Sequence, residues 1–350
     1  MMLKNTAAQF LSKKNLAFLA LIFCIVLIFS PATYTIQWVG LYLTMFSTMS
    51  NDSIQTMGTF LSSNSKVRWW ILWLYISLLF VFMVLFGWFY YDHILDFHRL
   101  STIPYEPNFN IMHLLAPILL IFLTCNKISV STTFLILSVF SSQNTITFML
   151  IKTFSGYCVA FFASFLLWFF LLKFFEKQFY FLNAQNTKVW IVLQWLSSGF
   201  LFCSWLTQNI PNTIVYIPRL IDLHSLILFI ILGICTIGFT IYNKGGPIQD
   251  IVDKKTDISN IKATTIINTT FAIIILIMNQ ISKIPIATTW VFLGVLGGRE
   301  MGLIKYEKND LPLKTKFLIA QKAILKDLVY ACLGIAISLI FYMINATYQS

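Results

Sequence analysis

The sequence predicts an all-α polytopic membrane protein built from inverted-topology repeats with broken or re-entrant helices. Three observations support this fold class: an apolar composition, repeated hydrophobic stretches of membrane-spanning length, and an internal repeat. The chain has 350 residues, of which 58% are hydrophobic and only 11% are charged. A soluble domain is roughly half apolar and about a quarter charged, so this composition excludes an ordinary soluble protein.

Hydrophobic stretches of about 20 residues, the length that crosses a bilayer as a helix, recur along the whole chain. The sequence predicts such stretches at 15–31, 35–62, 68–91, 108–126, 148–175, 188–217, 224–243, 263–281 and 323–345. Lysines precede the first stretch, as they do in a signal peptide, but a retained first helix suits a polytopic chain better.

Two shorter apolar pieces, 128–141 and 284–298, follow the 108–126 and 263–281 stretches almost immediately. The intervening residues are too few for an ordinary loop between two spanning helices. We therefore expect broken or re-entrant helices at these two places.

The two short pieces also belong to an internal repeat. "NKISVSTTFLILSVFSS" at 126–142 matches "SKIPIATTWVFLGVLGG" at 282–298, with the Thr-Thr pairs 156 residues apart. The polar stretch "SNDSIQTMGTFLSS" at 50–63 has a weaker match in "TQNIPNTIVYI" at 207–217, offset by 157 residues. The repeat divides the chain into an N-terminal helix (1–34), a first repeat (35–177) and a second repeat (188–345). Counting crossings gives the two repeats opposite orientations, which is typical of secondary transporters.

The net charge of +11 reflects orientation in the membrane rather than nucleic-acid binding. If the N-terminus is cytoplasmic, nearly all Lys and Arg residues fall on the cytoplasmic side, as the positive-inside rule requires. The loops at 244–262 and 299–322 are then cytoplasmic, and 93–107 and the C-terminus lie outside. We expect a multi-pass protein of the inner or plasma membrane.

Asp52 is the carboxylate that stands out. Of the 13 Asp and Glu residues, it alone lies well within a predicted span, where an unpaired charge costs several kcal/mol. Asn51, Ser53, Gln55 and Thr56 add oxygen atoms of the kind that Na⁺ or a proton relay uses. A structural polar patch between helices is the alternative.

Hydroxyl groups mark the start of both short apolar pieces. Ser131, Thr132 and Thr133 begin the first, and Thr288 and Thr289 begin the second. Hydroxyls and free N–H groups at a helix start suit an oxyanion, although plain N-caps are the alternative. Lys127 and Lys283 precede these clusters and are expected either at the membrane interface or near the anion.

These motifs resemble those of the inorganic phosphate transporter (PiT) family. "SNDSIQTMGTFLSS" resembles the family signature G-A-N-D-V-A-N-A-F-G-T-S-V-G-S, and "KISVSTTF" and "KIPIATTW" resemble its G-L-P-V-S-T-T-H. The stretch from Gln208 to Asn212 stands where the family has its second N-D-V-A-N. The resemblance spans about residues 40–345 in the right order.

The resemblance implies a phosphate and coupling-cation site near the midplane. It assigns substrate binding to Asn51, Ser131, Thr132, Thr133, Asn212, Thr288 and Thr289, and the coupling ion to Asp52, Gln55 and Asn209. This sequence departs from the family in several places: the second acidic position is Asn209, the motif glycines are Met49 and Leu206, the final histidines are Phe134 and Trp290, and lysines stand at 127 and 283.

The expected function is ion-coupled uptake of an inorganic oxyanion, phosphate first and sulfate second, by alternating access. The coupling ion would be Na⁺ or H⁺, with no organic cofactor. A non-transporting membrane scaffold is the alternative, and an enzyme ranks third because no nucleophile–base pair or metal constellation is visible. Expected partners are the anion and the lipid bilayer, not nucleic acid. The oligomeric state stays open, a homo-oligomer included.

Overall fold

The computed structural model describes residues 13–29, 34–174 apart from 107, 108, 110, 127 and 129, 188–249, 261–304 apart from 282, and 312–349. Helices form the regular structure of these residues, and an isolated bridge joins Ile94 to Leu220. The helices are α2 (Lys13–Phe29), α3 (Thr35–Asn51), α4 (Ser53–Ser63), α5 (Trp69–Tyr90), α6 (Ile111–Cys125), α7 (Thr132–Leu137), the 3₁₀ helix η2 (Ser138–Phe140), α8 (Gln143–Phe174), α10 (Lys188–Ile214), α11 (Leu223–Tyr242), α13 (Ile261–Ile281), α14 (Thr288–Leu303) and α15 (Leu313–Gln349).

Within the described residues, six helices are long and apolar enough to cross a membrane: α5, α8, α10, α11, α13 and α15. Large apolar side chains on their outer surfaces are exposed, among them Phe82 of α5, Phe162 of α8 and Leu333 of α15. An apolar surface of this extent suits lipid rather than water. The chain is an all-α polytopic membrane protein.

Both predicted helix breaks are confirmed. The first lies between the end of α6 at Cys125 and the start of α7 at Thr132, and the second between Ile281 of α13 and Thr288 of α14. Non-helical backbone is tolerated at membrane depth only where protein buries it. Val130 and Ile286, one in each break, are accordingly buried.

The predicted span 35–62 is not one uninterrupted helix. It is divided at Asp52, whose backbone N–H still bonds the Thr48 carbonyl while its own carbonyl accepts from Gln55 N–H. That second bond spans three residues, so the helix tightens by one 3₁₀-type turn at the carboxylate. The predicted loop 299–322 is also shorter than expected, because α14 extends to Leu303 and α15 already begins at Leu313.

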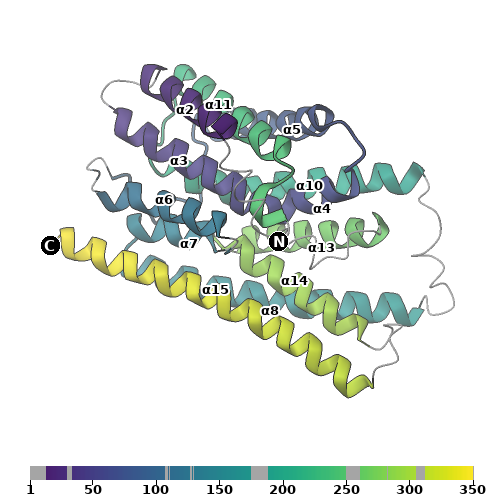
Figure 1. Cartoon of the computed structure of the whole chain (residues 1–350). Coiled ribbons are helices and arrows are strands. Elements are labelled where there is room, and N and C mark those ends of the chain that lie inside the picture. Colours follow the sequence, from purple (N-terminus) through teal and green to yellow (C-terminus); the bar gives the residue numbers. More distant parts are fainter. Residues whose placement is uncertain are drawn as a thin grey trace.

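Helix contacts occur in pairs that match the two repeats (Figure 1). Helix α14 packs along α8, and the corresponding α7 packs on α15; likewise α3 packs on α6 and α10 on α13. Helix α5 contacts both α10 and α11, and α11 also contacts α3. The offset of 156 to 157 residues therefore relates helix neighbours as well as sequence motifs.

Helix α14 approaches α8 closely along a row of glycines. A methyl group at Gly298 would come within 2.2 Å of the Phe161 carbonyl oxygen, and one at Gly294 within 2.6 Å of the Tyr157 carbonyl oxygen. Small residues four positions apart allow helix backbones to pack at this distance in a membrane. The glycine row therefore fixes where the start of α14 lies.

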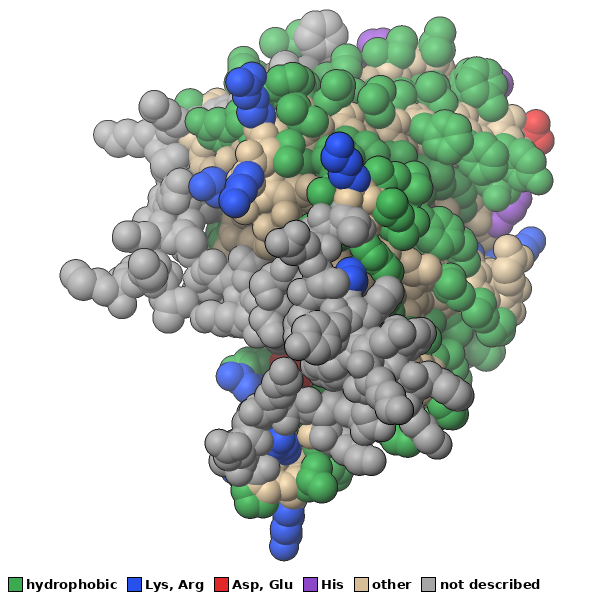
Figure 2. Space-filling view, turned by 90° about the vertical axis from the view of Figure 1, so that its right-hand side faces the viewer, with side chains coloured by type: hydrophobic (Ala, Val, Ile, Leu, Met, Phe, Trp, Pro, Cys, Tyr) green, Lys and Arg blue, Asp and Glu red, His purple; other side chains and the backbone are tan. Residues whose placement is uncertain are grey.

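Basic side chains gather at one end of the helix bundle. Figure 2 shows Lys and Arg on the face that contains the start of α10 and of α15 and the turn between α4 and α5. Lys66, Arg68, Lys188 and Lys314 are exposed there. At the opposite end, the segment expected as a loop at 93–107 is partly buried, with Leu95, Leu100 and Ile103 almost inaccessible.

Candidate functional site

All ten residues predicted for the site are buried, and none is more than 5% exposed. They come from four places: the junction of α3 and α4, the start of α7, the C-terminal end of α10 and the start of α14. Hydrogen bonds link these places across 79 to 237 residues of sequence. The fold thus brings both halves of the chain to one polar centre inside an apolar protein.

The Asp52 carboxylate is the centre of the first half of this site. Its Oδ1 atom accepts from Asn51 Nδ2 at 2.8 Å, from the Thr289 hydroxyl at 3.4 Å and from Gln55 Nε2 at 3.5 Å. Thr132 lies beside the carboxylate. The Asp52 Oδ2 atom and the Thr132 hydroxyl nevertheless have no hydrogen-bond partner of standard geometry.

Two amide side chains make equivalent contacts in the two repeats. Gln55 Nε2 donates to Thr289 Oγ1 at 3.1 Å and to Asp52. Asn212 Nδ2 donates to Thr133 Oγ1 at 3.1 Å and to Asn209 Oδ1 at 3.1 Å. Each amide therefore links the equivalent of position 52 in its own repeat to the threonine pair of the other repeat.

The backbone of each helix break is held by a second pair of equivalent amides. Asn51 Nδ2 donates to the Val130 carbonyl at 2.7 Å, and Gln208 Oε1 accepts from Ile286 N–H at 3.3 Å. These contacts satisfy backbone groups that have no helical partner and lie far from water. The polar motifs therefore have a structural role in positioning the breaks.

The hydroxyl clusters divide into different roles. The Ser131 side chain caps α7 by accepting from Phe134 N–H at 3.3 Å, and Thr288 Oγ1 accepts from Asn209 Nδ2 at 3.4 Å. Helix α7 has only six residues, whereas α14 has 16. A dipole argument for an anion therefore applies to α14, and at α7 the hydroxyl groups alone can contribute.

Three of the positions where this chain departs from the family motifs serve packing or lie at the surface. Phe134 and Trp290 are fully buried, and the Trp290 ring packs against Phe154 and Tyr157. Lys283 is exposed, as expected for a lysine at the interface, and Lys127 lies outside the described residues.

Four unpartnered oxygen atoms give the site its chemical character. They belong to Asn51 (Oδ1), Asp52 (Oδ2), Thr132 (Oγ1) and Asn212 (Oδ1), and all are inaccessible to solvent. Carboxylate, amide and hydroxyl oxygens are ligands for hard cations such as Na⁺. Among the described residues, no group of three or more His, Cys, Asp or Glu could hold a metal, so soft-metal chemistry has no ligand set there.

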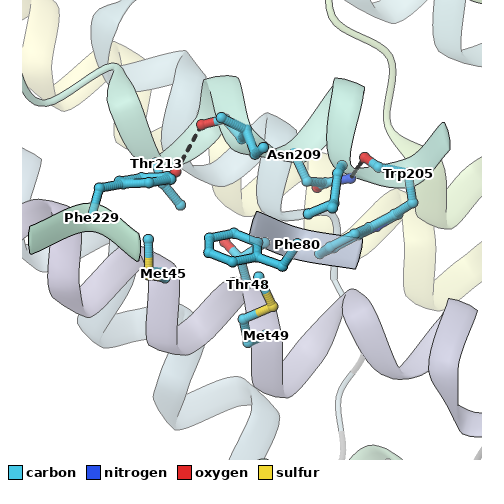
Figure 3. A pocket seen from close by; sticks show the side chains of 10 residues that line it. Met45, Thr48, Met49, Phe80, Trp205, Asn209, Thr213 and Phe229 are labelled. Carbon is cyan, nitrogen blue, oxygen red and sulfur yellow. Dashed lines mark hydrogen bonds between the residues drawn. The ribbon is translucent and has the colours of Figure 1, made fainter. Parts of the chain in front are cut away.

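A narrow cavity lies beside this centre, between α3, α5, α10 and α11. Figure 3 shows its lining, with Thr48 from α3, Asn209 and Thr213 from α10, and the aromatic rings of Phe80 and Phe229. Asn209 therefore lines both the polar centre and this cavity. The wall is otherwise largely apolar.

Sequence reasoning missed the cations that hold the second break. Lys152 is buried in α8 and donates to the Ile284 carbonyl. Arg99 donates to the Asn279 carbonyl near the end of α13 at 3.1 Å. The available signal was a lysine within the span 148–175, since a charge there is expensive unless a partner satisfies it.

Comparisons with known proteins give the fold. No protein-family model matches the chain, and no curated protein sequence matches it. Among solved structures, it is similar to "The sodium-dependent phosphate transporter", with a TM-score of 0.55 and 13% identity over 93% of this chain and 100% of that chain. The two share a fold. At this identity, function must be argued from the site.

Proposed function

We propose that this chain is a secondary transporter that moves an inorganic oxyanion, phosphate before sulfate, across the membrane together with a cation. The observation that carries the proposal is the polar centre, where Asp52, two amides and two threonine pairs meet among helix breaks from both halves. Buried ionisable groups in membrane spans are costly, so they usually mark a path for ions or substrate. The fold shared with a sodium-dependent phosphate transporter adds support.

On the cation side, Asp52 is the proposed ligand. Its carboxylate supplies a full negative charge, and the unpartnered oxygens of Asn51 and Thr132 complete a hard-oxygen set. In a low-dielectric interior, a cation there would offset much of the cost of burying the carboxylate. Gln55 donates to Asp52, and Asn209 takes the equivalent place in the second half, where it accepts from Asn212.

On the anion side, hydroxyls and the start of α14 are the proposed donors. Thr288 and Thr289 occupy the first turn of α14, where backbone N–H groups have no helical partner and the helix dipole favours negative charge. Thr132 would contribute its hydroxyl from α7. Asn51 and Asn212, whose N–H groups already donate within the protein, would hold the break and the Thr133 hydroxyl in place. A cation at Asp52 would keep the carboxylate from repelling the anion.

Alternating access about this centre is the proposed mechanism. The matched helix neighbours and the matched amide contacts support two inverted repeats with a site between them. We place the basic end of the bundle in the cytoplasm, which orients the protein with its N-terminus inside, in the inner or plasma membrane.

Uptake into proteoliposomes tests the proposal. Labelled phosphate and sulfate are offered separately, with Na⁺ and pH gradients varied independently of each other. We expect phosphate uptake above protein-free vesicles that responds to one of the two gradients and is stronger than sulfate uptake. Tight phosphate binding without any uptake would instead support the non-transporting scaffold.

A further inference from the structure

The two repeats differ at the one position where a cation ligand is expected. Position 52 is a carboxylate, whereas its equivalent, 157 residues later, is the carboxamide of Asn209. Both side chains are only 1% exposed. Asp52 accepts a hydrogen bond from Gln55, and Asn209 accepts one from Asn212, the equivalent amide of the second repeat. They therefore occupy equivalent places with different chemistry.

Around Asn209, the side-chain atoms have partners within the protein. Its Nδ2 group donates to the Trp205 carbonyl at 3.1 Å and to Thr288 Oγ1 at 3.4 Å, and its Oδ1 accepts from Asn212. The neighbouring Gln208 Oε1 accepts from Ile286 N–H. The carboxamide N–H groups thus contact oxygens that a cation in this half would otherwise use.

Around Asp52, the three equivalent atoms have no hydrogen-bond partner of standard geometry, although Thr132 lies beside the carboxylate. They are Asp52 Oδ2, Thr132 Oγ1 and Asn51 Oδ1, which correspond to Asn209 Nδ2, Thr288 Oγ1 and Gln208 Oε1. Unpartnered oxygens therefore concentrate in the first half, next to a full negative charge. In the second half, hydrogen bonds satisfy the corresponding atoms.

We propose that this chain couples a single sodium ion to each anion, bound at Asp52, and that the Asn209 carboxamide permanently takes the place of a second one. This inference rests on the proposed function and specifies its stoichiometry. The charge balance agrees: a carboxylate with a monovalent cation is neutral, and so is a carboxamide. The threonine pairs can then be held by the same amide contacts in both halves, with an ion beside Asp52 in the first half and no ion beside Asn209 in the second.

Equilibrium binding of labelled Na⁺ to the purified full-length protein tests this, with choline keeping the ionic strength constant. We expect one ion per chain in the wild type, none in Asp52→Asn, and two in Asn209→Asp. Asn268→Asp serves as the matched control, because Asn268 is equally buried in α13 but bonds Thr59 and Ser198 outside the centre. It should bind one ion, as the wild type does.

The outcomes separate the stoichiometry from the proposed function. Two ions in the wild type, with one left in Asp52→Asn, would overturn the single-ion inference and leave cation-coupled transport standing. No Na⁺ in the wild type would overturn the single-ion inference, and phosphate uptake that then responds to neither a Na⁺ nor a pH gradient would overturn the proposed function as well. If Asn209→Asp does not fold, the ratio of Na⁺ to phosphate transported by the wild type decides. A ratio of one supports the inference, and a ratio of two overturns it.

Discussion

Replacing Thr132 by valine should lower phosphate affinity without lowering stability. The Thr132 hydroxyl is buried beside the Asp52 carboxylate but has no hydrogen-bond partner of standard geometry, so its desolvation cost is poorly compensated. Valine has the same shape and removes that cost, which is about 1–3 kcal/mol. If the hydroxyl donates to the anion, the lost charged hydrogen bond of about 1.5–3 kcal/mol should weaken binding on the order of tenfold to a hundredfold.

Thr133→Val is the control for this prediction. The Thr133 hydroxyl is also buried, but it accepts from Asn212 and lies 3.5 Å from the Ile286 carbonyl oxygen. Removing it leaves the Asn212 amide without this partner, so stability should fall by about 1–3 kcal/mol. Thermal unfolding in detergent gives the stability, and isothermal titration with phosphate gives the affinity. Thr132→Val with lower stability and unchanged phosphate affinity would refute the reasoning.

Three further predictions concern the fold and its orientation. A single cysteine at Lys314 should react with a membrane-impermeant reagent only from the cytoplasmic side, and labelling from outside would contradict the orientation. Gly298→Ala should destabilise the protein by about 1–3 kcal/mol through overpacking against α8. Gly297→Ala should be tolerated, because its added methyl group would lie 3.4 Å from the nearest side-chain atoms, an ordinary contact distance. Gln55→Leu and Asn212→Leu should both lower thermal stability, because each removes a bond to position 52 or 209 and a bond to a threonine of the other repeat; a loss in only one would argue against equivalent repeats.

Much of the fold could be predicted from the sequence because the bilayer limits what an apolar chain can form. Length and hydropathy gave the spanning helices, and the short gaps before Thr132 and Thr288 gave the two breaks. The matched polar motifs of the internal repeat also indicated which residues meet at the polar centre. The exact helix ends were less predictable. The hydrophobic stretch was expected to begin at 323, but α15 begins at Leu313, because Lys314 and Lys316 lower the hydropathy without interrupting the helix.

The contacts within the site could not be read from the sequence. Whether Asn209 binds an ion or bonds Thr288 depends on the packing of α10 against the second break, which are 79 residues apart. The same holds for Lys152, whose partner Ile284 lies 132 residues away. Spacing shows which residues are equivalent, but tertiary packing decides which of their atoms keep a free lone pair.

The most direct test of the central claim is phosphate accumulation in proteoliposomes driven by an imposed inward Na⁺ gradient, measured per folded molecule for the wild type and for Asp52→Asn. The account predicts accumulation above the external concentration in the wild type, lost when choline replaces Na⁺. It predicts no Na⁺-dependent accumulation in Asp52→Asn, although that variant keeps the three acceptor contacts through an amide oxygen. Equal Na⁺-driven accumulation in both proteins would contradict the assignment of the coupling ion to Asp52.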